Sequence, residues 1–181
     1  ALNALLTREQ FVAEVIEGLL PSPGYFPENV RLNKQGYQSL ETIKANGLCP
    51  LSADQVKLLA GNRKALILDT RSPQAFTEQH VPGSISIGLD GQFAPWVGAL
   101  IADILQPLVL IVDEGREEEA LTRLARVGYD GVLGYLEGGL AAWAKAGFET
   151  DSVPNISAIQ LKELPVEAVS VIDVRKPGEY V

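Results

Sequence analysis

From residue 49 onward, short apolar runs alternate with stretches in which apolar residues recur every three or four positions. The short runs at residues 65–69, 85–87, 108–112 and 132–136 predict strands. The run at 108–112 is aliphatic throughout, which is typical of a central parallel strand buried on both faces. The helical spacings at residues 53–59, 94–105, 117–127 and 140–146 predict helices. This order predicts an α/β fold, a parallel sheet with helices on both faces.

Residues 1–45 lack this alternation. Thr7 is placed to cap a helix with apolar residues at helical spacing, namely Phe11, Val12, Val15, Ile16 and Leu19. Prolines and glycines at 21–24 end it, and residues 25–36 combine aromatic residues and proline without strand alternation. We interpret residues 1–45 as a helical tail of a preceding domain, or a linker, that docks on the domain after it.

One sequence pattern occurs twice. Residues 51–59 and 66–73 read LSADQVKLL and LILDTRSP, and residues 156–164 and 171–177 read ISAIQLKEL and VIDVRKP. The copies lie about 105 residues apart, which is the length of a domain rather than of a solenoid unit. We therefore expect one complete domain at 46–150, and a linker with the truncated start of a second copy at 151–181. The chain is then a piece of a longer protein.

Charge and composition exclude several classes of function. The chain is 46% hydrophobic and 21% charged, as in globular proteins, and its net charge of −8 disfavours nucleic acids and anionic membranes as partners. The apolar runs are too short to span a membrane, and the first residues lack the pattern of a signal peptide. A single cysteine, Cys49, cannot form an internal disulfide. We expect a cytoplasmic protein.

Three polar or ionisable residues have predicted structural roles. Asp69 ends a strand two residues before Arg71, so the two can form a charge-assisted pair that ties the loop to the sheet edge. His80 is the only histidine, which leaves no histidine cluster for a metal and no dyad of histidines. We expect His80 to donate a hydrogen bond that fixes a turn. Cys49 is expected to be a small, partly buried core or linker residue.

Three segments together resemble the rhodanese homology domain, a sulfurtransferase fold. They are ILDTRSPQAF at 67–76, QHVPGSISI at 79–87 and GYDGVLGYLEGGLAAW at 128–143, in the family's order and spacing. Their fold markers are Asp69, Arg71, His80, Gly83, Gly138, Gly139 and Trp143. Gly138 and Gly139 are expected to form the close turn before the last helix, on which Trp143 packs in the core.

The resemblance implies a catalytic cysteine directly after the central strand, on a loop whose backbone N–H groups lower the thiol pKa and stabilise a persulfide. This chain has Asp113 at that position, in the loop DEGREEE at 113–119. A carboxylate cannot accept and pass on a sulfane sulfur, and the glutamates of the loop repel anionic donors. We therefore expect no catalytic residue, no metal and no cofactor in this chain, and a structural or docking role toward neighbouring domains or in a homo-oligomer.

The loop still offers candidates for an anion site: Asp113, Glu114, Gly115, Arg116, Glu117 and Glu118. Either the Asp113 carboxylate, helped by Glu117 or Glu118, fills this site, or the acidic helix start is simply solvated. Two rival functions remain open. One is a catalytically active enzyme of the rhodanese type. It would transfer thiosulfate or persulfide sulfur through Cys49, or use Asp113 as a phosphatase does. The other is an anion or persulfide sensor that uses Arg116.

A second resemblance concerns residues 1–45. The helix, the prolines at 21–27 and the segment RLNKQG at 31–36 resemble the C-terminal end of a metallo-β-lactamase-fold domain of the persulfide-dioxygenase kind. Such domains occur fused to rhodanese domains in bacterial sulfide-handling proteins. The resemblance implies that iron or zinc and the hydrolase or dioxygenase chemistry belong to a further N-terminal domain, because this chain lacks that family's metal-ligand motifs.

Overall fold

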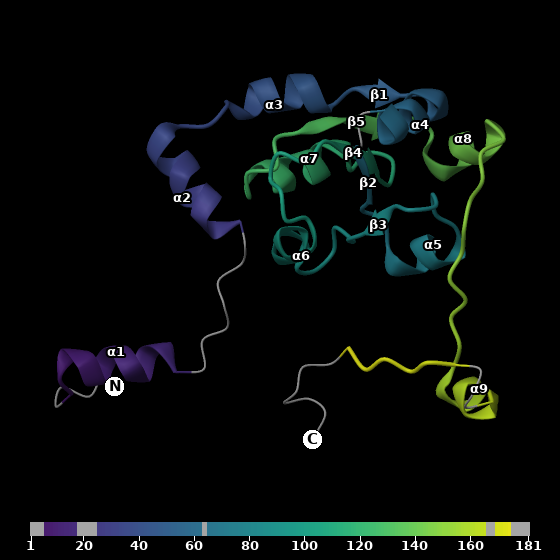
Figure 1. Cartoon of the computed structure of the whole chain (residues 1–181). Coiled ribbons are helices and arrows are strands. Elements are labelled where there is room, and N and C mark those ends of the chain that lie inside the picture. Colours follow the sequence, from purple (N-terminus) through teal and green to yellow (C-terminus); the bar gives the residue numbers. More distant parts are fainter. Residues whose placement is uncertain (1–5, 18–24, 63–64, 166–168, 175–181) are drawn as a thin grey trace.

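The computed structural model describes residues 6–17, 25–62, 65–165 and 169–174. Its centre is a parallel sheet of five strands in the order β1-β5-β4-β2-β3 (Figure 1). The strands are β1 (Pro50–Leu51), β2 (Leu66–Asp69), β3 (Ile85–Ser86), β4 (Leu108–Ile111) and β5 (Val132–Leu136). The predicted α/β fold is confirmed, and β1 is an additional short edge strand that the apolar pattern did not predict.

Strand β4 lies in the middle of the sheet, as its uninterrupted apolar run predicted. It pairs with β2 over four residues and with β5 on its other side, and all four of its side chains are buried. Leu108 and Leu110 join one hydrophobic core, whereas Val109 and Ile111 join a second core on the opposite face. Alternation along a strand explains this division, because successive side chains point to opposite faces.

Helices cover both faces of the sheet (Figure 1). The first core lies under α3 (Leu40–Gly47), α6 (Phe93–Leu100) and α7 (Glu117–Ala125). The second core lies under α4 (Ala53–Asn62) and α8 (Gly139–Lys145), while α5 (Pro73–Glu78) lies beside β3. Predicted ends of helices are present: the Ser52 hydroxyl accepts a hydrogen bond from the Gln55 amide, and Gly128 follows α7 with a φ of +85°.

Strand β5 contains a bulge that the sequence pattern did not indicate. Leu108 pairs with Val132 but Val109 pairs with Gly134, so β5 has one extra residue at this step. Gly134 has a φ of +150°, and a β-carbon there would collide with the carbonyl oxygen of Cys49. Only glycine fits this close approach of β5 to the edge strand β1 without strain.

The N-terminal region is more helical than predicted. Helix α1 (Arg8–Ile16) has the expected Thr7 cap, whereas Leu19 lies outside the described residues. Residues 25–36, predicted to be irregular, form α2 (Phe26–Gln35). Pro27 does not prevent this helix because it occupies the first turn, where its missing N–H costs no intrahelical hydrogen bond.

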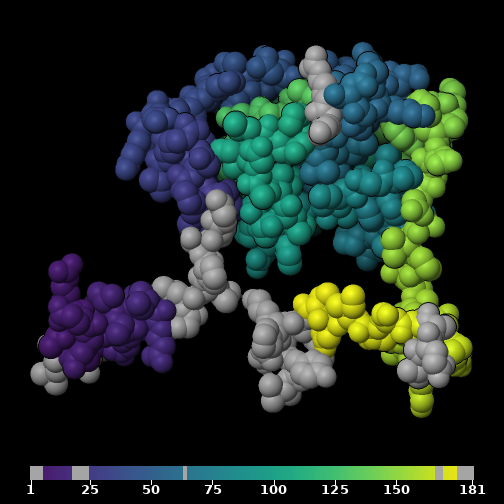
Figure 2. Space-filling view, in the orientation of Figure 1, coloured from purple at the N-terminus to yellow at the C-terminus, as the bar shows by residue number. Residues whose placement is uncertain are grey.

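Tyr25 and Ile43 dock this region on the sheet domain, because both are buried in the first core. The buried Tyr25 belongs to the first core, and its ring lies against Gly98 of α6, so closely that a side chain at Gly98 would overlap it. Figure 2 shows α2 and α3 in blue and violet-blue, continuous with the teal and green sheet domain. The described residues 25–47 thus pack on the sheet domain through α2 and α3, while the interpretation of residues 1–45 as a tail of a preceding domain or a linker stays a prediction.

Helix α6 is shorter than the predicted helix at 94–105. It ends at Leu100, and Ile101 adopts an extended conformation. Ile101 and Ile104 are nevertheless buried in the first core, which explains the apolar spacing beyond the helix. Within the described part of the chain, no helix has both the length and the apolar character needed to cross a membrane.

The repeated pattern begins again at α9 (Ala158–Glu163), which has a Ser157–Gln160 capping box. Its second half, residues 171–174, forms no strand and is exposed, although the matching β2 is a strand. The difference has a physical reason: β2 is hydrogen-bonded between β3 and β4, and no described segment provides such neighbours for residues 171–174. Arg175 lies outside the described residues.

Candidate functional site

The loop after β4 lies where three parallel strands end side by side. Thr70, directly after β2, donates from its amide and its hydroxyl to the Ile111 carbonyl, at 2.8 and 3.1 Å. The amide of Leu89, beyond β3, donates to the Thr70 carbonyl at 3.0 Å. These bonds fix the carboxyl ends of β2, β3 and β4 together, which is the usual position of ligand sites in open parallel sheets.

The loop itself is a tight turn in which two amides, those of Gly115 and Arg116, have acceptors within the loop. The Arg116 amide donates to the Asp113 carbonyl at 3.0 Å, and Gly115 supports the turn with a φ of +84°. The Gly115 amide donates to Glu117 Oε1 at 3.2 Å. The Asp113 carboxylate is exposed and has no hydrogen bond to any described residue. Glu117, rather than Asp113, is therefore the acid that accepts from a loop amide.

Arg116, the loop's cation, is held by carboxylates from two elements. Its guanidinium donates to Glu119 at 2.9 and 3.1 Å and to Asp90, beyond β3, at 3.1 Å. These hydrogen bonds raise the pKa of Arg116 above its ordinary value. The contact with Glu119 is the largest cause, and the contact with Asp90 is the second. An anion that approached Arg116 would have to compete with two carboxylates already bound to it.

A second arginine of α7 connects this helix to the segment after β3. Arg123 donates to the main-chain carbonyls of Leu89 and Gly91, and its guanidinium lies 5.3 Å from the centre of the Phe93 ring. Sequence reasoning missed Arg123 and Asp90. Arg123 could have been found from its i+4 spacing to Glu119, and Asp90 from its position at the carboxyl end of a parallel strand.

The acidic loop also contacts the N-terminal helices. Lys44 of α3 donates to Glu118 of α7 at 2.5 Å. Glu114 is exposed at the tip of the turn. Of the six loop candidates, the side chains of Arg116, Glu117 and Glu118 thus have hydrogen-bond partners, whereas those of Asp113 and Glu114 are exposed and have none among the described residues.

The predicted pair of Asp69 and Arg71 is present beside this site. Asp69 is fully buried, and Arg71 donates to its two oxygens at 2.7 to 3.2 Å. Arg71 also donates to the Gln79 carbonyl at 2.8 Å, which ties the loop after β2 to the end of α5. His80 Nδ1 donates to the Phe76 carbonyl at 2.9 Å, and the two rings stack at 4.1 Å. Arg71 and His80 thus each hold a turn together, as expected.

The remaining fold markers lie in turns or in the core. Gly83, Gly138 and Gly139 all have positive φ, and the latter two form the turn into α8. Trp143 is buried in the second core and donates from Nε1 to the Glu149 carbonyl at 2.8 Å. No cluster of three or more histidine, cysteine, aspartate or glutamate side chains suited to a metal ion occurs in residues 6–17, 25–62, 65–165 and 169–174.

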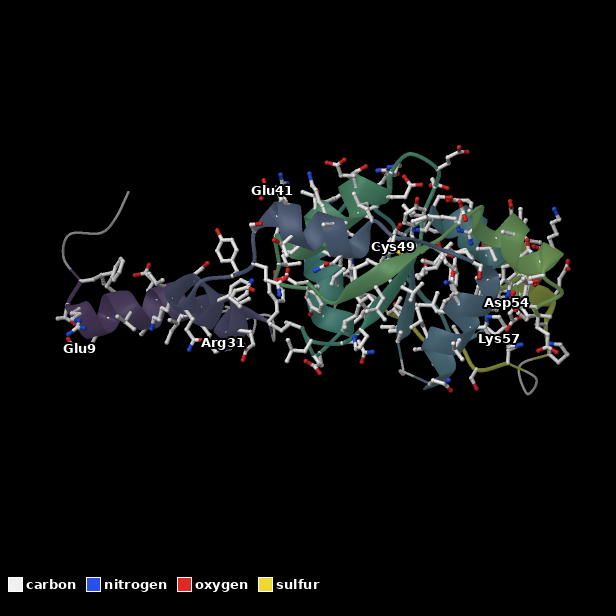
Figure 3. The ribbon with its side chains drawn as sticks, turned by 90° about the horizontal axis from the view of Figure 1, so that it is seen from above. Glu9, Arg31, Glu41, Cys49, Asp54 and Lys57 are labelled. Atoms are coloured by element: carbon white, nitrogen blue, oxygen red, sulfur yellow. The ribbon has the colours of Figure 1, made fainter. Side chains whose placement is uncertain are left out.

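Cys49 is exposed, so the prediction of a partly buried residue was wrong. It directly precedes the edge strand β1 (Figure 3). Strand β5 separates β1 from β4, so the thiol does not belong to the loop that begins at Asp113.

The contact between Arg116 and Glu119 predicts a measurable change in the pKa of Glu119. Hydrogen bonding by Arg116 is the largest cause that lowers the pKa of Glu119 below its ordinary value. We expect Arg116→Met to raise the pKa of Glu119 toward that value, as followed by carboxyl carbon shifts in NMR. In Arg123→Met, which removes only a weaker partner, the pKa should rise less. Equal shifts in both variants would contradict the dominant role of Arg116.

Comparison of the sequence with known protein families identifies the family of this domain. The profile of the rhodanese-like domain family matches residues 52–146. The chain therefore belongs to the rhodanese-like domain family, which the sequence motifs had predicted. A curated relative, an uncharacterized protein of Buchnera aphidicola subsp. Schizaphis graminum, is 26% identical over 98 residues. This match covers 54% of the present chain and 66% of the relative, slightly less than two thirds of its length.

Solved structures show the same fold. The Alr3790 protein from Anabaena sp. superposes with a TM-score of 0.51 at 20% identity, over 63% of this chain and 100% of that chain. A metallo-β-lactamase from Staphylococcus aureus subsp. aureus COL gives a TM-score of 0.55 at 24% identity. That match covers 74% of this chain but only 36% of the staphylococcal chain.

Proposed function

We propose that residues 46–150 form a rhodanese-like domain without a sulfur-carrying residue, which acts as a structural or docking module in a multidomain protein of sulfide or persulfide metabolism. One observation carries the proposal: the loop after β4 begins with Asp113 where an active rhodanese has its cysteine, and its arginine is bound by Glu119 and Asp90.

The chemistry of sulfur transfer explains why this observation matters. The carrier must be a thiolate, because only sulfur forms the S–S bond of a persulfide that a nucleophile can later cleave. Asp113 has no such chemistry. The surrounding acids also disfavour thiosulfate and other anionic donors electrostatically, because the positive charge of Arg116 is already compensated.

The attachment of the linker after α8 supports a spacer role. His80 and Asp151 form a reciprocal pair of main-chain hydrogen bonds, and the Val153 amide and the Asn155 side chain both bond to Thr77 of α5. The extended segment is thereby held along α5 instead of leaving the domain at Gly147. Such fixation sets the direction in which the following copy of the repeat starts.

The proposed parent protein has a metallo-β-lactamase-fold domain, with its iron or zinc, before residue 46, and a second rhodanese-like domain after residue 151. Support comes from the similarity of residues 1–45 to that fold's C-terminal end and from the match to part of a staphylococcal metallo-β-lactamase. The repeat at α9 supports the second domain. Neighbouring domains of the same chain are then the partners of this domain.

A sulfur-transfer assay from thiosulfate to cyanide tests the proposal. We expect no turnover by the wild-type chain, and none by Cys49→Ser. Because the loop scaffold is intact, any gain of activity should be confined to Asp113→Cys. The exposure of Cys49 favours one alternative, a live sulfurtransferase with this thiol as carrier. Turnover by the wild type that is lost in Cys49→Ser would establish that alternative and overturn the proposal.

A further inference from the structure

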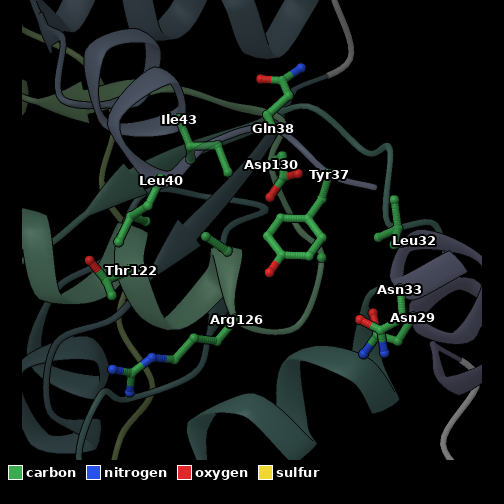
Figure 4. Close-up of a pocket in the computed structure, with 12 residues that line it drawn as sticks. Asn29, Leu32, Asn33, Tyr37, Gln38, Leu40, Ile43, Thr122, Arg126 and Asp130 are labelled. Atoms are coloured by element: carbon green, nitrogen blue, oxygen red, sulfur yellow. The ribbon is translucent and has the colours of Figure 1, made fainter. Parts of the chain in front are cut away.

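A cavity of about 400 Å³ opens between the N-terminal helices and the sheet domain, at the opposite end of α7 from the acidic loop (Figure 4). Its walls come from α2, the connection to α3, α3 itself, the second half of α7, and the turn before β5. The volume lies in the range of small-molecule sites, about 300–1,000 Å³. None of the loop residues discussed above lines it.

The lining combines an apolar wall with polar side chains that lack protein partners. Leu32, Leu40, Ile43 and Ala125 form the apolar part. The polar part comprises Asn29, Asn33, Gln38, Thr122, Arg126 and Asp130, whose side chains have no hydrogen bond to any described residue. Asn33, Gln38 and Arg126 are exposed to solvent, whereas Asn29, Thr122 and Asp130 are partly buried. The partly buried three are the informative ones, because folded chains pair most of their buried polar groups.

Asp130 is the most unusual of these groups. Its Oδ1 is buried and has no hydrogen-bond partner among the described residues. Burial raises the pKa of this carboxyl, which shows that the protein offers the carboxylate little stabilisation of its own. Because Asp130 also lines the cavity, a ligand that donates to its carboxylate from the cavity would stabilise the charged form and gain binding free energy.

The charge of the preferred ligand follows from the same residues. Asp130 is the only acid among the described residues that line the cavity, and Figure 4 shows it between Gln38 and Tyr37, near the middle of the close-up. Arg126, the only cation in the same described set, is exposed and extends away from Tyr37 in this view. A donor that carries positive charge would complement Asp130, and the net charge of −8 favours cations in general.

We propose that this cavity binds a small organic cation, an ammonium or guanidinium group on a short apolar chain. The cationic group donates to the Asp130 carboxylate, and side-chain oxygens of the surrounding amides and Thr122 accept its remaining hydrogens. The apolar chain lies against Leu40 and Ile43. This site is independent of the proposed function, since it uses neither Asp113 nor the residues around Arg116.

Three probes that each contain four carbon atoms but carry different polar groups test the proposal: butylamine, which is cationic at neutral pH, 1-butanol and butyrate. Binding is followed by amide shifts in NMR. We expect saturable shifts from butylamine at Thr122, Ala125 and Asp130, and at most weak ones from the other two. Asp130→Asn should weaken butylamine binding by about tenfold or more, as expected for loss of a charge-assisted hydrogen bond.

A matched control is Asp54→Asn, which makes the same change on the exposed surface of α4 (Figure 3) and should leave the affinity unchanged. Ala125→Leu fills the cavity without altering charge and should also abolish binding, so the test does not depend on the folding of Asp130→Asn. Equal binding of butanol or butyrate, unchanged affinity in Asp130→Asn, or the absence of saturable shifts with butylamine would each overturn the proposal.

Discussion

Replacing Arg71 by methionine is expected to lower the free energy of unfolding by about 3–5 kcal/mol, because it leaves a buried carboxylate without its counter-charge. Asp69 is 0% exposed, and four hydrogen bonds join it to the side chain and amide of Arg71. The substitution also removes the donor to the Gln79 carbonyl. Urea unfolding followed by circular dichroism measures the loss.

Arg116→Met is the matched control for this prediction. Arg116 also has two carboxylate partners, but Asp90 is 86% exposed and Glu119 is 43% exposed. Water screens these pairs, so the loss of stability should be much smaller. If Arg71→Met cost no more than Arg116→Met, the buried pair would not be the structural link described above. The double variant with Asp69→Asn should recover part of the loss, since it removes the unpaired charge.

The second large effect is expected at the bulge of β5. Gly134→Ala should destabilise the domain through two separate costs, a strained backbone at φ +150° and a collision with the Cys49 carbonyl, each about 1–3 kcal/mol. The collision would force β1 away from β5. Hydrogen exchange of the Tyr135 and Glu137 amides, which donate to Cys49 and Leu51, reports on that separation.

Gly147→Ala separates the two costs at this bulge. Gly147 also has a positive φ of +80°, but no atom lies within 4 Å of the position of a β-carbon. Its loss of stability should therefore be the backbone cost alone, about 1–2 kcal/mol. An equally small loss in Gly134→Ala would mean that the edge strand moves without cost, contrary to the close approach in the structure.

Prediction from sequence succeeded where the physical cause is local. Ser52 caps α4 through an amide three residues away, and Arg71 reaches Asp69 two residues away. The apolar run at 108–112 predicted a central strand because burial on both faces admits no polar alternation. The irregular interpretation of residues 25–36 failed because the docking of Tyr25 on Gly98 anchors α2, and this contact joins distant parts of the chain.

The candidate site was predictable in its residue types but not in its contacts. The sequence alone showed that Asp113 follows the central strand and that acids surround Arg116. It did not show that Asp90 would reach Arg116, since 26 residues separate them and only the adjacent ends of β3, β2 and β4 bring them together.

By itself the sequence determined β2 to β5 and the helices α4, α6, α7 and α8, the family and the absence of a thiol from the loop after β4, because periodicity, caps and residue chemistry act over a few positions. It did not predict β1, α2, α3 or α5. Tertiary structure alone decided which acids neutralise Arg116, that Cys49 is exposed, and that Asp130 faces a cavity without a partner among the described residues. The exposure and the contacts of these side chains depend on how distant elements pack together. For the cavity, the packing of α2, α3 and α7 on the sheet decides which groups are buried.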